Sequence, residues 1–198
     1  MKKFELTTEF ITNAFGKKLF RIKALVEFGD VKAGELGGYV EKEGNVSQDD
    51  NAWVSGDAEV FGNAKVSGNA KVFGNAKVYD NAWVSGDARV YDNAWVFGDA
   101  RVSGDAWVSD NAWVSGDARV SGDADYALVQ GFGTEFRCTT FYRGKNKKIM
   151  VNCGCFHGDL EGFRKQVKET RNGKIAKEYL MIADLMEYHF TSEDSSNE

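Results

Sequence analysis

Several features are missing from this sequence, and each absence excludes a class of protein. No run of 18 consecutive apolar residues occurs, so we expect no membrane-spanning helix. The first residues, MKKFELTTEF, lack the apolar segment of a signal peptide. The three cysteines are an odd number and all lie late in the chain, which is typical of a reducing compartment rather than of a disulfide framework. We therefore expect a cytoplasmic protein.

Positive charge is also in short supply. The net charge is −5 at pH 7, which argues against a general nucleic-acid binder. Apolar residues make up 42% and charged residues 28% of the 198 positions, so the chain is not a disordered tail and can bury a good-sized core. Proline is absent, whereas glycine occurs 22 times.

A six-residue repeat occupies the middle of the chain. Valine recurs at every sixth position, with an alanine two residues before each valine. The valines are Val54, Val60, Val66, Val72, Val78, Val84, Val90, Val96, Val102, Val108, Val114 and Val120. A period of six fits neither an α-helix nor a long strand, but it fits short strands joined by tight turns, with Ala and Val on the same strand face. The Gly-Asp, Gly-Asn and Asp-Asn pairs between the strands tolerate the left-handed backbone angles of sharp corners.

The residues that follow the valines indicate a three-sided coil. Every third one is serine, whereas the other two sides carry Phe, Tyr and Ser. The serine column is Ser67, Ser85, Ser103 and Ser121. A six-residue period alone does not sort residues in this way, but a coil with 18 residues per turn does. The twelve valines then form about four regular coils, each ~4.8 Å from the next.

The run VSGDARVYDNAWVFGDARVSGDAWV resembles the hexapeptide repeats of left-handed parallel β-helix proteins. The left-handed sense is implied by this resemblance alone. We predict a mainly β protein: a three-sided, left-handed parallel β-helix followed by a C-terminal α+β cap of ββαα type.

Four segments are expected along the chain. These are an N-terminal cap with irregular first rungs (1–50), the β-helix (51–124), the ββαα module (125–190) and a disordered tail (191–198). In the cap we expect strands at Phe4–Thr7 and Leu19–Val26. In the ββαα module we expect a hairpin of Phe136–Tyr142 with Lys148–Cys153, a helix after Asp159 as N-cap, and a second helix over roughly Lys174–His189.

A wider resemblance takes in both ends of the chain. The N-terminal run GDVKAGELGGYVEKEGNVS, the repeats and the later CGCF-x-GDLEGF together resemble hexapeptide-repeat proteins encoded by phages and prophages. This resemblance implies a product made inside a bacterial host cell. It also suggests that the partner is a host protein, with inhibition of a defence system as one role.

An enzymatic alternative follows from the β-helix resemblance, because many hexapeptide-repeat proteins are acyltransferases that use coenzyme A or acyl-carrier protein. That chemistry needs a general base, usually a histidine on or near a coil. Residues 51–124 contain no histidine, and both His157 and His189 lie later in the chain. We therefore expect a non-catalytic protein without a cofactor. An acyl-CoA-dependent acyltransferase and a small-nucleotide-sequestering protein remain the alternatives.

One group of residues has the donor atoms of a metal site. Cys138, Cys153, Cys155 and His157 together offer three sulfurs and an imidazole, which suits tetrahedral zinc. The C-x-C-x-H spacing lacks the usual two-residue separation of zinc ligands, however. We favour reduced, partly buried cysteines in a small core, so no metal is expected and the group stays a candidate only.

The outward-facing columns of the coil are the candidate binding site. All five tryptophans directly precede repeat valines, so their side chains should point away from the valine core. Trp, Tyr and Arg are enriched at interface hot spots. The predicted partner-binding residues are Tyr79, Trp83, Arg89, Tyr91, Trp95, Phe97, Trp107 and Trp113.

A protein partner is the expected ligand of these columns. The alternatives are self-association as a dimer or trimer, and coverage of one side by the chain's own termini. We do not expect nucleic acid, because aspartates occupy many of the corners and the repeat segment is net negative.

Overall fold

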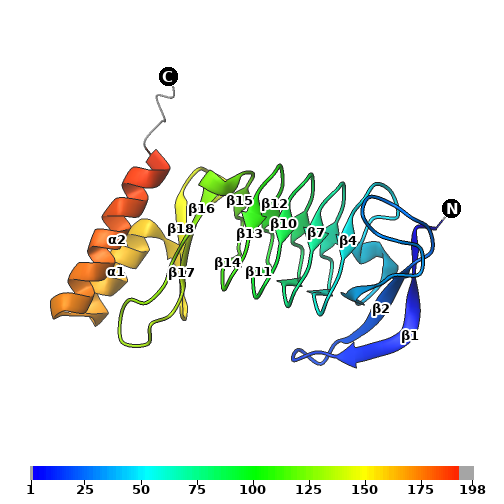
Figure 1. Cartoon of the computed structure of the whole chain (residues 1–198). Coiled ribbons are helices and arrows are strands. Elements are labelled where there is room, and N and C mark those ends of the chain that lie inside the picture. The colour runs from blue at the N-terminus through cyan, green and yellow to red at the C-terminus, as the bar shows by residue number, and fades with distance from the viewer. Residues whose placement is uncertain (1, 192–198) are drawn as a thin grey trace, which may run out of the picture. The chain divides into compact units, whose positions relative to one another are not determined.

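The computed structural model describes residues 2–191 and contains a three-sided parallel β-helix (Figure 1). Its first side consists of β4 (Trp53–Val54), β7 (Lys71–Val72), β10 (Arg89–Val90) and β13 (Trp107–Val108). Its second side includes β5 (Glu59–Val60), β8 (Lys77–Val78), β11 (Trp95–Val96) and β14 (Trp113–Val114). Its third side consists of β6 (Lys65–Val66), β9 (Trp83–Val84), β12 (Arg101–Val102) and β15 (Arg119–Val120). The expected β-helix is confirmed.

The parallel register confirms the 18-residue coil. Val90 pairs with Val72 on one neighbouring coil and with Val108 on the other. The repeat valines from Val54 to Val120, and the alanines that precede them, have at most 1% of their surface exposed. Burying one valine side chain contributes about 1.5–3 kcal/mol. The small alanine lets the three sides approach one another, while the valine fills the interior.

The corners of the coil need backbone angles that few residues adopt. Gly86 has φ of 69°, and a Cβ atom there would lie 2.9 Å from the backbone of Gly104 on the next coil. Asparagine ladders add side-chain hydrogen bonds between coils. The Asn51 amide donates to Asn69 Oδ1 at 2.9 Å, and the Asn69 amide donates to Asp87 Oδ1 at the same distance. The turn chemistry therefore explains the Asn/Asp columns without a metal.

The N-terminal segment continues the second side of the coil. Strands β1 (Phe4–Thr12) and β2 (Lys18–Ala24) form an antiparallel hairpin, β2 pairs with β3 (Leu36–Val40), and β3 pairs in parallel with β5 (Figure 1). The first strand is longer than predicted and contains a register shift between Leu6 and Phe10. A 3₁₀ turn at Glu43–Asn45 leads to a bridge between Val46 and Val66.

A buried lysine fixes the start of the chain to the first coil. The Lys3 ammonium donates to the carbonyl oxygens of Asp49, Asp50 and Ala52 at 2.9–3.2 Å. Burial lowers the pKa of Lys3 to about 8, although the Asp50 and Asp49 carboxylates oppose that shift. Gln48 Oε1 accepts from the backbone N–H of Lys3 at 2.8 Å. The segment 48–52 therefore anchors the start of β1.

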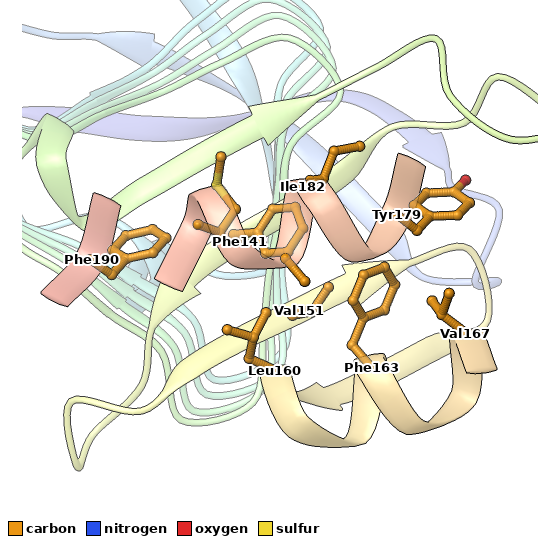
Figure 2. Packing of buried hydrophobic residues seen from close by; sticks show 10 residues of the cluster. Phe141, Val151, Leu160, Phe163, Val167, Tyr179, Ile182 and Phe190 are labelled. Carbon is orange, nitrogen blue, oxygen red and sulfur yellow. The ribbon is translucent and has the colours of Figure 1, made fainter. Parts of the chain in front are cut away.

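The C-terminal unit follows a 3₁₀ turn at Asp123–Asp125 and has its own sheet and core (Figure 2). Its antiparallel sheet has the order β16 (Tyr126–Val129), β17 (Thr139–Arg143), β18 (Ile149–Cys153) and β19 (Phe156–Asp159). Helices α1 (Leu160–Thr170) and α2 (Gly173–Thr191) follow. The central hairpin and both helices match the prediction, whereas β16 and β19 are additional to it.

The two helices pack on this sheet through apolar faces. Asp159 caps α1 as predicted, since its carboxylate accepts from the Gly162 N–H at 2.9 Å. The core side chains are Phe141, Val151, Leu160, Phe163, Val167, Tyr179, Ile182, Ala183, Met186 and Phe190. Arg164 of α1 links the helices, because its guanidinium contacts three carboxylates at 2.7–2.8 Å. These are Glu161, Asp184 and Glu187.

The chain divides into two compact units, Met1–Asp123 and Ala124–Glu198. The tail predicted to be disordered, 191–198, falls outside the described residues except for Thr191, which ends α2. Among residues 2–191, no helix is long and apolar enough to cross a membrane.

Candidate partner-binding surface

The second side of the coil carries a stacked aromatic column. The parallel register places Trp95 beside Trp113, with ring centroids 5.1 Å apart and planes 11° apart. Phe97 meets Trp113 edge to face at 6.3 Å and stacks on Tyr79 at 5.0 Å. Trp113 is 40% exposed. Residues 18 apart on one side therefore form a continuous column of aromatic rings.

The first side combines aromatic rings with a cation. Phe73 and Tyr91 stack at 5.0 Å, and Trp107 meets Tyr91 edge to face at 6.4 Å. The Arg89 guanidinium lies 4.7 Å from the centre of the Trp107 ring, within the range of a cation–π contact. Trp107 is 44% exposed. Arg89, Tyr91 and Trp107, three of the predicted partner-binding residues, therefore lie together on the first side.

The third side is mostly polar, with one exposed tryptophan. The Trp83 indole N–H donates to Ser67 Oγ at 2.9 Å, and Arg101 lies 5.6 Å from the Trp83 ring centre. The serine column is on this side, as the three-sided arrangement requires. Trp83 is thus separated from the aromatic columns of the other two sides.

The N-terminal segment covers part of the aromatic columns, and coverage by the chain's own termini is one of the alternatives that the sequence leaves open. Trp53 is only 3% exposed because Phe4 and Phe28 pack edge to face on it. Tyr79 is 9% exposed because Phe15, in the turn between β1 and β2, packs against it. The chain's own hairpin therefore covers most of Tyr79, and the role of Tyr79 in partner binding stays a prediction.

The burial of Tyr79 beneath Phe15 makes its phenol harder to ionise. Burial raises the pKa of its phenol to about 12, with a smaller contribution from the negative charge of Asp80. The sequence allows for coverage by the termini, but it does not single out Phe15. The only feature of the sequence that points to this contact is an aromatic residue, Phe15, next to the Gly16-Lys17-Lys18 segment.

Charges flank the second side. Lys77 forms an ion pair with Glu59, and its ammonium lies 6.0 Å from the centre of the Trp95 ring. Toward the later coils, one of the two flanking corner columns changes from asparagine to aspartate: Asp99 accepts from the Asn81 amide at 3.1 Å, and Asp117 stands in the same column. The exposed aromatic surface is therefore bordered by acidic corners.

The structure does not assemble the cysteines and histidine into a metal centre. Cys153 Sγ accepts from Thr139 Oγ1 at 3.1 Å, Cys155 is exposed, and His157 Nδ1 lies 2.6 Å from Asn152 Oδ1. Cys138 is half-buried, and the three cysteines form no disulfide. Within the described part of the chain, no group of three or more His, Cys, Asp or Glu side chains is placed to hold a metal ion.

The fold and its surface define a β-solenoid repeat protein. A family model described as the YdcK beta solenoid repeat matches residues 82–98, 88–104, 94–110 and 100–116. Successive matches are offset by six residues, which is the period of the valines. A search of curated proteins finds no match to the chain. The similarity is to the repeat itself and covers the region that contains Trp83, Trp95, Trp107 and Trp113.

Proposed function

We propose that the protein is a non-catalytic binding protein whose coil presents aromatic columns to a protein partner. The observation that carries this proposal is the stacked pair of Trp95 and Trp113, with Phe97 beside it, on the coils beyond Phe15. Large exposed aromatic groups on a protein surface mark interaction sites. Tryptophan, tyrosine and arginine supply most of the affinity at such sites.

The rigidity of the columns favours binding. Each ring is held by its neighbour on the next coil, and the strands beneath are fixed by backbone hydrogen bonds such as Phe97 N–H to the Val114 carbonyl at 3.0 Å. A side chain that is already ordered loses little conformational freedom on binding, whereas an immobilised flexible side chain costs about 0.5–1.5 kcal/mol. Ordered aromatic columns therefore offer contact area at a low entropic cost.

The nature of the partner follows from the resemblance to phage and prophage proteins. A protein made from such genes acts in the cytoplasm of a bacterial host, so we propose that the partner is a host protein. Binding would occupy a functional surface of that partner, and a defence protein is the kind of target that a phage gains from blocking. The acidic corners beside the aromatic surface favour a partner with basic groups around an apolar centre.

The experiment is an affinity capture from bacterial lysate with three forms of the tagged chain. The native chain is compared with the Trp95→Ala/Trp113→Ala variant and with Trp83→Ala as the matched control on the third side. We expect a partner retained by the native chain and by Trp83→Ala but lost from the double variant. Retention by all three forms would contradict the proposed surface. Heat on titration with acetyl-CoA would instead favour the acyltransferase alternative.

A further inference from the structure

Two cysteines flank a glycine at the turn between β18 and β19. Cys153 is the last residue of β18 and pairs in register with Phe156, the first residue of β19. Gly154 and Cys155 are therefore the two central residues of a tight turn. Gly154 has φ of 60° and Cys155 has a negative φ, which is the pattern of a type II′ hairpin turn.

The turn sets the separation of the two cysteines. Consecutive Cα atoms are ~3.8 Å apart, and the bend of a tight turn brings residues two apart to about 5.5 Å. Most disulfides join Cα atoms that are roughly 4.4–6.8 Å apart. Both thiols also border one hollow of about 80 Å³ in the C-terminal unit. The residues around this hollow include Arg137, Cys153, Gly154, Cys155, Arg171 and Tyr179. The separation is thus compatible with a bond between the two sulfurs.

The two thiols have different surroundings. Cys155 is exposed. Cys153 is half-buried, its Sγ accepts from Thr139 Oγ1 at 3.1 Å, and it lies beside the phenol of Tyr179. Burial raises the pKa of Tyr179, and the neighbouring Cys153 adds to this shift. Redox-sensing cysteines are accessible to solvent and often lie next to a second cysteine that resolves the first product. Cys155 and Cys153 have these two properties.

Two arginines give the hollow a positive charge. The Arg137 guanidinium lies against the turn, since a Cβ atom on Gly154 would be 2.9 Å from Arg137 Nη1. Its contact with Glu135 is 3.8 Å long and joins exposed side chains, so it neutralises Arg137 only weakly. Arg171 donates to the Thr170 carbonyl at 3.3 Å and pairs with no carboxylate among the described residues. The hollow therefore favours a reagent that carries carboxylates.

We propose that Cys153 and Cys155 form a redox-active dithiol that reacts with small disulfides carrying carboxylates, such as glutathione disulfide. The Cys155 sulfur, having lost its proton, attacks one sulfur of the small disulfide. A mixed disulfide forms, and the first thiol leaves with a proton. The Cys153 sulfur, having lost its proton, then attacks Cys155 Sγ, which forms the Cys153–Cys155 bond and releases the second thiol.

The reaction is balanced and reversible. The chain loses two electrons and two protons, and the small disulfide gains them and becomes two thiols. Disulfides of this kind in reducing compartments are usually transient and redox-sensing. The site lies in the C-terminal unit, apart from the aromatic columns in the residues that form it, so this inference is independent of the proposed function.

The test uses the reduced full-length chain and glutathione disulfide. Samples are quenched with acid and analysed by intact mass and peptide mapping. We expect the native chain to lose the mass of two hydrogens, with the bond mapped to Cys153 and Cys155. Cys153→Ser should stop at a mixed disulfide on Cys155, because the resolving thiol is missing. Cys138→Ser is the matched control and should form the same bond at the native rate.

Three results would overturn the proposal. The first is that the native chain forms no internal disulfide in excess glutathione disulfide. The second is that the bond formed joins Cys138 instead of Cys153 or Cys155. The third is that Cys155→Ser reacts as fast as the native chain, which would place the attacking thiol elsewhere.

A second set of variants tests the two arginines. Glutathione disulfide is compared with cystamine, which carries ammonium groups and no carboxylates. Relative to the same chain unfolded in urea, the native chain should prefer glutathione disulfide by about 3–10-fold at low ionic strength, and salt should weaken this preference. Arg137→Met/Arg171→Met should abolish the preference while bond formation is retained.

The matched control for charge is Lys145→Met/Lys147→Met, in the turn between β17 and β18. This variant loses the same charge at a place that does not border the hollow, so its preference should match that of the native chain. An equal preference in the native chain and in the double arginine variant would refute the selection of carboxylates. An equal loss in both double variants would show that net charge, and not the hollow, selects the reagent.

Discussion

The inside of the coil can be distinguished from its outside by two substitutions one residue apart. Val84 is fully buried in the third side, and Ser85 is half-buried on the outer face. Val84→Ala removes two methyl groups, worth about 0.8 kcal/mol each, and the residual cavity adds to this loss. We expect a total destabilisation of about 2–3 kcal/mol. Ser85→Ala touches only the surface and should stay within about 0.5 kcal/mol of the native chain.

Urea unfolding followed by tryptophan fluorescence measures this difference. All five tryptophans lie between Trp53 and Trp113, so the signal reports the unit that contains the coil. With a urea dependence of about 1–3 kcal/mol per molar, Val84→Ala should lower the midpoint by roughly 1 M or more. Equal losses for the two variants, or a larger loss for Ser85→Ala, would refute the assignment of valines to the interior. Val84→Asp should be more severe still, because it buries an unpaired charge.

Three other predictions concern the corner residue Asp99, the packing of Phe15 on Tyr79, and the ion pairs of Arg164. Asp99→Asn should stabilise the coil by about 0.5–1 kcal/mol, because the new amide donates to Asp117 and the repulsion between two neighbouring carboxylates is removed; a lower melting temperature would contradict this. The Tyr79 phenol should ionise near pH 12, and the stability that depends on its neutral form should be lost as pH rises from 10 to about 12. Tyrosinate absorbance should show Phe15→Ala lowering that pKa toward 10, and no change would mean that Phe15 is not the cover. Arg164→Met should destabilise the C-terminal unit by about 1–2 kcal/mol through the loss of three charged contacts. Backbone amides of α2 should then exchange with solvent hydrogen faster than in the native chain. Unchanged protection of these amides would contradict the prediction.

The coil could be predicted from the sequence because every level of the pattern agrees. The six-residue period fixes the strand length, the serine column fixes the number of sides, and the glycine and aspartate positions fix the corners. Each of these signals is local, and each is repeated many times. The cap of α1 was equally predictable, because Asp159 precedes a clear apolar helical stripe at Leu160, Phe163 and Val167.

Features that depend on distant contacts were not predictable in the same way. Strand β19, with the sequence FHGD, has no alternating apolar pattern and exists because its backbone pairs with β18. The burial of Tyr79 depends on Phe15, which lies 64 positions earlier in the chain and has no sequence relation to the repeat. The composition of the columns therefore indicated a binding surface, whereas its limits depend on which coils the hairpin covers.

Contact between the aromatic column of the second side, at the 40% exposed Trp113, and a protein partner can be captured by site-specific photo-crosslinking. A benzoylphenylalanine placed at Trp113 is compared with the same group at Ser103, on the third side of the coil. Both proteins are irradiated in bacterial lysate and the adducts are identified by mass spectrometry. We expect one discrete adduct from position 113 and none from position 103. The same adducts from both positions, or adducts from position 103 alone, would contradict the proposed binding surface.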